Sequence, residues 1–377
     1  MGYGGGGGGG GGSGGSGGGG GSGSGGSGGS GAGGASGYRR VGDDRTANIK
    51  ADNITSRDGS SGTDVDGIVK VNTTAHFIPP SGTTAERGSR GRAVRAGGIV
   101  PGARTNTIDY FTIPTLGNAV DFGNLTSATA QGGGCSSSTR GIFGGTTPNG
   151  STDTNNIEYI TISSTGNAFD FGDFTKVGLG RRGASNETRG IFFGRGDNPL
   201  IFKDITYIEI ATKGNAADFG ELTEASASGG ALANNTRGIY AIRSNSSNTI
   251  DYITIATTGN AQDFGDYHTA NVAITNGLSS PTRGVFSGGY IPSASTDEIS
   301  YITIASKGDT QDFGNLTVAY NEQATTSSHI RGVIMGANDN HIEYITIAST
   351  GNAADFGDLT QVVSFAMACS DSHGGLG

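Results

Sequence analysis

The sequence predicts an all-β fold, a six-bladed β-propeller with four short strands in each blade. A segment of the type IEYITIASTGNAADFGDLT occurs six times, starting at Ile108, Ile157, Ile205, Ile250, Ile299 and Ile342. Each copy follows a shorter element led by arginine, as in TRGIFGG at 139–145. One repeat has about 48 residues, which is typical of a four-stranded blade and too long for one coil of a β-helix.

The spacing of the repeated residues separates packed parts from surface loops. The leading Ile and the Asp of Asp-Phe-Gly keep one spacing in all six copies, as in Ile108 and Asp121. The next arginine follows that Asp at a nearly constant spacing, as Arg140 follows Asp121. The spacing from the arginine to the following Ile varies from copy to copy, and it is much shorter after Arg331 than after Arg140. Fixed spacing indicates a packed unit, and variable spacing indicates a loop at the surface.

Four strands are expected in each repeat. The first is the arginine-led element, and the second is Ile-Glu-Tyr-Ile-Thr-Ile, which is rich in β-branched and aromatic residues. Thr-Gly-Asn forms a hairpin turn, because Gly and Asn tolerate positive φ. Ala-x-Asp-Phe-Gly is the third strand, and the fourth lies after Leu-Thr, as in 127–138. The second strand has apolar residues on both faces, which a sheet packed between two others requires.

Three regions are expected along the chain. Residues 1–37 hold 26 of the 73 glycines and predict a Gly/Ser-rich tail, either a flexible tether or polyglycine II helices that associate between chains. Residues 38–88 form a β-rich connector for attachment, and residues 89–377 form the propeller. At the C-terminus, SHGGLG stands where a seventh arginine-led element would begin. It is either the closing strand of the ring or the edge of a longer protein.

Composition argues against several function classes. The net charge of −9 and pI near 5.0 disfavour nucleic acid as a partner. The sequence has no apolar run long enough for membrane insertion, and its N-terminus lacks the apolar core of a signal peptide. The five histidines do not cluster with Cys or Glu, so neither a metal site nor a cofactor is expected. Cys135 and Cys369 occupy equivalent repeat positions, either as buried thiols or as a ring-closing disulfide.

The repeated charged residues are expected to be structural. Asp-Phe-Gly is the magnesium-binding tripeptide of protein kinases, but the other kinase motifs are absent and six catalytic copies make no sense. We expect the Asp to cap a turn and the Phe to pack between blades; calcium binding is the alternative. The arginines should pair with carboxylates or carbonyls of a neighbouring blade, or line the channel to bind an anion. These structural residues are Arg92, Arg140, Arg189, Arg237, Arg283, Arg331, Asp121, Asp170, Asp218, Asp263, Asp312 and Asp355.

The variable loops are the expected ligand-binding surface. Equivalent loops of a propeller emerge on one face, and here they are rich in Asn, Asp, Ser and Thr, which suits carbohydrate or protein-surface recognition. The loops cover 99–107, 146–156, 195–204, 243–249, 290–298 and 337–341. The candidate ligand-binding residues are Arg104, Asn106, Asn149, Asp153, Arg195, Asp197, Asn198, Arg243, Tyr290, Asp297, Asn338, Asp339 and His341.

The repeats resemble two groups of proteins. The Arg-Gly-(Ile/Val)-Phe-Gly-Gly strand, with paired glycines at 97–98, 144–145 and 288–289, resembles kelch propeller blades, although the blade Trp is absent. The whole TRGIFxGG…IDYITIxTxGNAxDFGDLT unit is similar to propeller-repeat virion and tail proteins of marine bacteriophages, over roughly residues 50–377.

The second resemblance implies a non-enzymatic structural protein of the phage virion, such as a tail-associated appendage. Its N-terminal region would bind other virion proteins or associate with itself, and its loop surface would bind a glycan or protein on the host. A bacterial cell-surface adhesin is the alternative. A glycan hydrolase is a third interpretation. It would need a cluster of carboxylates around the central channel, at repeat positions that differ from blade to blade.

Overall fold

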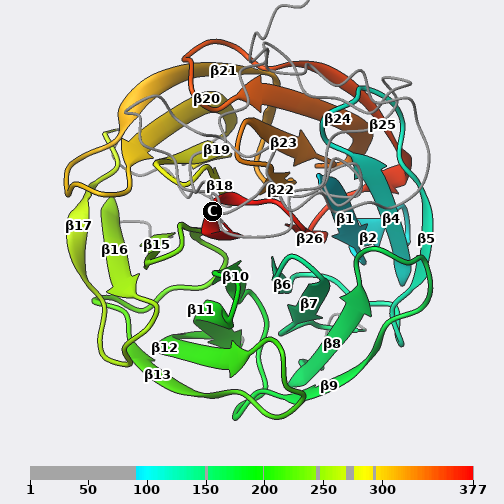
Figure 1. Cartoon of the computed structure of the whole chain (residues 1–377), viewed down its shortest axis with the longest axis horizontal. Coiled ribbons are helices and arrows are strands. Elements are labelled where there is room, and N and C mark those ends of the chain that lie inside the picture. The colour runs from blue at the N-terminus through cyan, green and yellow to red at the C-terminus, as the bar shows by residue number, and fades with distance from the viewer. Residues whose placement is uncertain are drawn as a thin grey trace, which may run out of the picture. The chain divides into compact units, whose positions relative to one another are not determined.

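Six antiparallel four-stranded sheets surround a central axis and form a six-bladed β-propeller, as the sequence predicts (Figure 1). The computed structural model describes residues 91–148, 152–197, 199–242, 247–268, 276–291 and 294–376. The expected tail and connector, 1–37 and 38–88, lie outside the described residues.

The strands of each blade follow one order from the channel outward. Blade 1 has β26 (Met367–Ser370), β1 (Arg92–Ala96), β4 (Thr107–Thr112) and β5 (Val120–Asn124); blade 2 has β6 (Gly133–Ser136), β7 (Arg140–Gly144), β8 (Asn156–Thr161) and β9 (Phe169–Asp173). Blade 3 has β10 (Arg182–Ser185), β11 (Arg189–Asp197), β12 (Leu200–Glu209) and β13 (Ala217–Glu221); blade 4 has β14 (Gly230–Ala233), β15 (Arg237–Ala241), β16 (Thr249–Thr254) and β17 (Gln262–Asp266). Blade 5 has β18 (Gly277–Ser279), β19 (Arg283–Ile291), β20 (Ala294–Thr303) and β21 (Gln311–Tyr320); blade 6 has β22 (Ala324–Ser327), β23 (Arg331–Met335), β24 (Asp339–Thr346) and β25 (Ala354–Val363). A small hairpin of β2 (Ile99–Val100) and β3 (Ala103–Arg104) and the 3-10 turn η1 (Gly374–Leu376) complete the described elements.

The fourth strand of each sequence repeat belongs to the next blade. β6 follows blade 1 in the chain but pairs with β7 of blade 2, with Cys135 opposite Ile142. Repeat and blade are therefore offset by one strand, and blade 1 lacks an inner strand of its own. The C-terminal β26 supplies it, with Cys369 opposite Val94. The closing strand thus lies just before SHGGLG, whose described residues, 372–376, form no strand.

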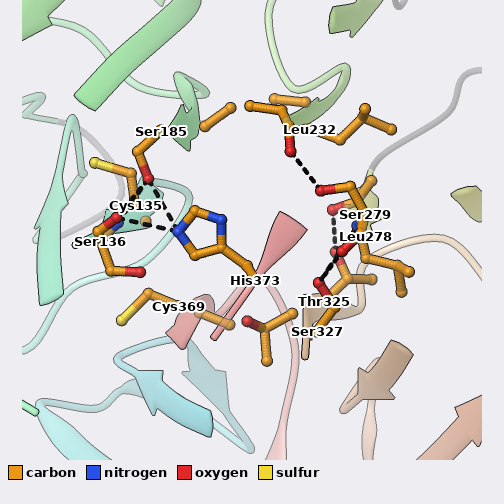
Figure 2. A pocket seen from close by; sticks show the side chains of 18 residues that line it. Cys135, Ser136, Ser185, Leu232, Leu278, Ser279, Thr325, Ser327, Cys369 and His373 are labelled. Atoms are coloured by element: carbon orange, nitrogen blue, oxygen red, sulfur yellow. Dashed lines mark hydrogen bonds between the residues drawn. The ribbon is translucent and has the colours of Figure 1, made fainter. Parts of the chain in front are cut away.

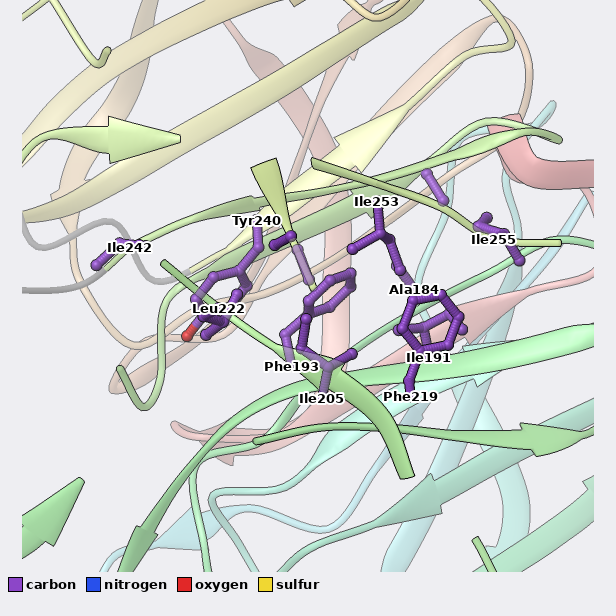
Figure 3. Packing of buried hydrophobic residues seen from close by; sticks show 13 residues of the cluster. Ala184, Ile191, Phe193, Ile205, Phe219, Leu222, Tyr240, Ile242, Ile253 and Ile255 are labelled. Carbon is purple, nitrogen blue, oxygen red and sulfur yellow. The ribbon is translucent and has the colours of Figure 1, made fainter. Parts of the chain in front are cut away.

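The core consists of six apolar clusters, each built from two adjacent blades. In the cluster between blades 3 and 4, Ile191 and Phe193 face Tyr240 and Ile253 (Figure 3). The rings of Phe193 and Tyr240 stack with their centroids 5.3 Å apart. Because every blade has a neighbour on both sides, its middle strands must be apolar on both faces, as the sequence indicates.

The Thr-Gly-Asn turn docks each blade onto the blade before it. At the junction of blades 3 and 4, the Gly259 N–H donates to the carbonyl of Phe219 at 2.8 Å, and Asn260 Oδ1 accepts from the Glu221 N–H at 3.1 Å. Equivalent bonds occur at the other five junctions, with Asp309 in the place of Asn between blades 4 and 5. The constant spacing therefore reflects contacts between blades as well as within them.

The two faces of the propeller are built from different connections. The variable connections between the second and third strands of every blade lie at one end of the antiparallel sheets, which we name the loop face. The Thr-Gly-Asn turns lie at the other end, which we name the turn face. The sequence prediction that the variable loops share one face is thus in agreement with the strand order.

Candidate functional site

The repeated arginines bind the next blade. Arg140 Nη1 donates to the carbonyl of Ile210 in blade 3 at 2.7 Å, while its guanidinium lies 4.7 Å from the centre of the Tyr159 ring. The other five arginines make the same two contacts. The prediction of bonds to neighbouring carbonyls is confirmed. The arginines start the second strands and do not line the channel cavities, so the anion-binding ring is wrong.

The aspartates of Asp-Phe-Gly do not cap turns. All six are exposed and lie within the outermost strand of their blade, as Asp170 does in β9. The expected turn cap is wrong, because the side chain that binds the turn-face backbone is Asn260 and its equivalents. The phenylalanines pack between blades as predicted, with Phe171 and its five equivalents buried.

Small residues line a narrow central channel. The inner strands enclose two cavities of about 50 and 40 Å³, one toward each face. Serine hydroxyls tie neighbouring inner strands together; Ser185 Oγ donates to the Ser136 carbonyl at 2.7 Å, and Ser136 Oγ donates to the Ser370 carbonyl at 2.6 Å. The described lining of both cavities contains Arg182 and His373 but no carboxylate.

His373 closes the channel at the turn face (Figure 2). Its Nε2 lies 3.0 Å from the Ser136 carbonyl, and its Nδ1 accepts from the Gly375 N–H at 3.1 Å. One donating and one accepting nitrogen describe a neutral imidazole. Burial lowers the pKa of His373 to about 4, although the bond to the Ser136 carbonyl opposes that shift. The C-terminal segment is therefore a plug that is held by an uncharged histidine.

Acid should weaken this plug, because the unfolded chain protonates His373 before the folded protein does. The pKa of His373 is lowered from 6.5 to about 4, so its contribution is complete above pH 6.5 and is lost as the pH falls toward 4. The free energy of unfolding should drop by at most about 1.4 kcal/mol per pH unit in this window. Thermal unfolding between these pH values would measure it. His373→Gln should flatten the slope, and an unchanged slope in that variant would contradict the assignment.

The predicted loop-face residues have different environments. Asn149, Asn198 and Arg243 lie outside the described residues. Asn106 Nδ2 donates to the Leu125 carbonyl at 3.4 Å, and Asn155 and Asn248 make the same bond in their blades, so Asn106 supports the fold. Arg104 is half-buried in β3. Exposed candidates are Asp197, Tyr290, Asp297 and Asn338.

Two groups of candidates come together. At blade 6, Asp339 accepts a hydrogen bond from the Tyr320 hydroxyl at 2.6 Å and one from the His341 N–H at 3.1 Å. Where blades 2 and 3 meet, Asp153 and Asp197 lie near Arg195, and burial raises the pKa of Asp153. The remaining described candidates are distributed around the ring.

The charge cluster of blade 3 contains Arg181 and Asp204, which were not among the candidate residues predicted from the sequence. Arg195 Nε donates to Asp204 at 2.7 Å, and its guanidinium lies 3.6 Å from the centre of the Phe202 ring. Arg181 is buried, and burial lowers its pKa to about 10. Its guanidinium donates to the carbonyls of Gly178 and Lys176. A difference between the repeats could have identified Arg181, because blades 2 and 4 have glycine at the equivalent position.

Apolar side chains are exposed at two hairpins of the loop face, in blades 3 and 5. The β11–β12 hairpin ends with Asp197 opposite Leu200, and Leu200 and Ile201 are 59% and 49% exposed. Tyr290, at the end of β19 in blade 5, is 40% exposed. Neighbouring apolar side chains that are exposed together are typical of contact surfaces for other molecules.

The remaining sequence predictions concern the two cysteines, metal binding and membrane spans. Cys135 and Cys369 are free and buried, so the alternative of a ring-closing disulfide is wrong. Burial raises the pKa of both thiols. In the described part of the chain, no group of three or more His, Cys, Asp or Glu could hold a metal ion. No described helix is long and apolar enough to cross a membrane.

Comparison with known proteins shows the architecture and nothing beyond it. No protein-family model and no curated protein matches the chain. Among solved structures 575 chains match, which shows how widely this fold is used. One of them is the structure of YjhT, with a TM-score of 0.53 and 9% sequence identity, and the match covers 64% of this chain and 87% of YjhT. At that identity the likeness shows that this chain shares the propeller fold.

Proposed function

We propose that the protein is a non-enzymatic component of a bacteriophage virion, such as a tail-associated appendage, in which the loop face binds a host-surface glycan or protein or another virion protein. The region before residue 89 would attach the propeller or bring copies together. The similarity of the repeats to phage propeller proteins supports the virion assignment. The contrast between the two faces supports the binding role.

The proposal rests on this contrast between the turn face and the loop face. On the turn face, every blade repeats the same arginine, glycine and asparagine or aspartate contacts to its neighbour. On the loop face, the connections differ in length and in side chains. Connections that differ from blade to blade cannot all make one shared structural contact, so they are free to vary with a ligand. The described channel lining has no carboxylates, and hydrolysis of a glycosidic bond commonly uses a pair of them.

The apolar tip of the β11–β12 hairpin is the part of the loop face to test. Leu200→Asp with Ile201→Asp should weaken binding of the labelled full chain to a panel of marine bacterial cells or to purified phage particles. Each apolar side chain that a contact buries contributes about 1.5–3 kcal/mol, so a loss of about tenfold or more is expected.

Leu116→Asp is the matched control, because Leu116 is also 59% exposed but lies on the turn face of blade 1. It should leave binding unchanged, and all variants should keep the melting temperature of the parent. Equal binding by both variants would refute the role of the hairpin. Mass spectrometry of purified particles would separate a virion protein from the alternative of a bacterial adhesin, since an adhesin would be found on cells and be absent from particles.

A further inference from the structure

Blades 4 and 5 have matching pockets on the turn face, away from the variable loops. The first has a volume of about 210 Å³ and lies between the end of β16 and the turn that leads into β17. The second, of about 180 Å³, lies between β20 and β21. Pockets for drug-sized ligands measure roughly 300–1,000 Å³, so an occupant of these two would be about one ring in size.

A tyrosine–glutamine pair distinguishes these two blades from the others. The Tyr252 hydroxyl donates to Gln262 Oε1 at 2.6 Å, and the Tyr301 hydroxyl donates to Gln311 Oε1 at 2.6 Å. Each bond holds the amide in one orientation, and among the described residues no group accepts a hydrogen bond from its NH₂ group. The residues opposite the tyrosine in blades 1, 2, 3 and 6 are Val120, Phe169, Ala217 and Ala354.

Apart from Ile253 in blade 4 and Ile302 and Lys307 in blade 5, the rest of each lining consists of short polar residues and glycine. Thr254, Thr257 and Thr258 provide hydroxyls in blade 4. An added Cβ on Gly259 would meet nothing within 4 Å, and the same is true of Gly308 in blade 5. A ligand can therefore approach the main chain of the turn without displacing a side chain.

The charges at the pockets cancel. The blade-4 lining has no ionisable group except Tyr252. The blade-5 lining includes Lys307 and Asp309, one charge of each sign. Lys307 Nζ also lies 4.9 Å from the centre of the Tyr252 ring, so it stands between the two sites. Hydroxyls, an oriented amide and an aromatic ring, with the charges of Lys307 and Asp309 offsetting each other, match the alternating donors and acceptors of a hydroxylated ring.

We propose that the two pockets are equivalent binding sites for one neutral six-membered sugar ring each. The inference goes beyond the proposed function, because it assigns a second binding surface opposite the loop face. Two similar sites on adjacent blades suit a glycan with repeating units, because a second ring binds at a high effective concentration once the first is bound.

The test uses the full chain and methyl glycosides of glucose, galactose, mannose and N-acetylglucosamine as probes. Saturation-transfer NMR should detect at least one of them. Gln262→Phe with Gln311→Phe should fill both pockets, because blade 2 has Phe169 at this position, 5.8 Å from Tyr159 between ring centres. Binding should fall by about tenfold or more, as expected when interactions worth about 1.4 kcal/mol are lost.

Ala217→Phe with Ala354→Phe is the matched control, since it places the same side chain opposite the tyrosines of blades 3 and 6 and should leave binding intact. No saturation transfer to any probe, or equal transfer in both double variants, would overturn the proposal. So would preferential binding of galacturonate that Lys307→Met abolishes, because the ligand would then be anionic. Leu200→Asp with Ile201→Asp should not affect these probes, so failure here is distinguishable from failure of the loop-face proposal.

Discussion

A chain that lacks residues 366–377 is expected to lose the cooperatively folded propeller. These residues supply β26, and without it the inner edge of β1 stays unpaired in the interior. The truncation also removes Asp371, whose carboxylate accepts hydrogen bonds from the N–H groups of Gly91 and Arg92 at 2.5 and 2.9 Å in the intact chain. Unpaired buried backbone groups lower the free energy of unfolding. The truncation also removes Met367 and Cys369 from the apolar cluster between blades 1 and 2.

Thermal unfolding followed by near-ultraviolet circular dichroism would measure the effect. A loss of several kcal/mol corresponds to a melting temperature lower by about 10 °C or more for a domain of this size. Removal of 373–377 alone is the control, because it deletes the plug and keeps β26. That shorter truncation should cost much less. If both truncated chains melted within about 2 °C of the intact protein, β26 would not be what closes the ring.

The repeat pattern was sufficient to predict the blades, because each blade depends on local periodicity. Alternation within Ile157–Ile162 describes contacts made within one repeat. Glycine at the turns and the constant spacing from Ile to Asp-Phe-Gly recur in every copy, although they also serve contacts between neighbouring blades. Pairing between repeats was not visible in the same way. β6 is adjacent in sequence to blade 1 but pairs with blade 2, and β26, the last described strand, pairs with β1, the first.

The candidate site was less predictable than the fold. Asn106 stood out in a variable loop, but its amide bonds to its own blade, as the equivalent Asn155 and Asn248 do. Arg195 was correctly placed on the loop face, yet its burial depends on Phe202 and Asp204 on the next strand. His373 binds Ser136, which lies in a distant repeat of the chain, and no local pattern reports such a contact.

Gly220→Ala is expected to destabilise the propeller more than any exposed substitution in the repeat. Gly220 belongs to Asp-Phe-Gly of blade 3 and has φ of +152°. An added Cβ would lie 2.4 Å from the carbonyl oxygen of Gly259 in blade 4, which is backbone and cannot rotate away. The blades would have to separate, which weakens the bond from the Gly259 N–H to the Phe219 carbonyl. We expect a loss of about 3 kcal/mol or more, from strain and overpacking together.

Gly214→Ala is the control that separates backbone strain from the clash. Gly214 has φ of +154°, but an added Cβ there would meet nothing within 4 Å. Denaturant unfolding should show a larger loss for Gly220→Ala, by about 2 kcal/mol, and equal losses would exclude the clash as the cause. Asp218→Ala should change stability by about 0.5 kcal/mol or less, because its side chain is exposed. The tripeptide would then be repeated for its glycine and phenylalanine, which join neighbouring blades, and the carboxylate that suggests catalysis would be the dispensable part.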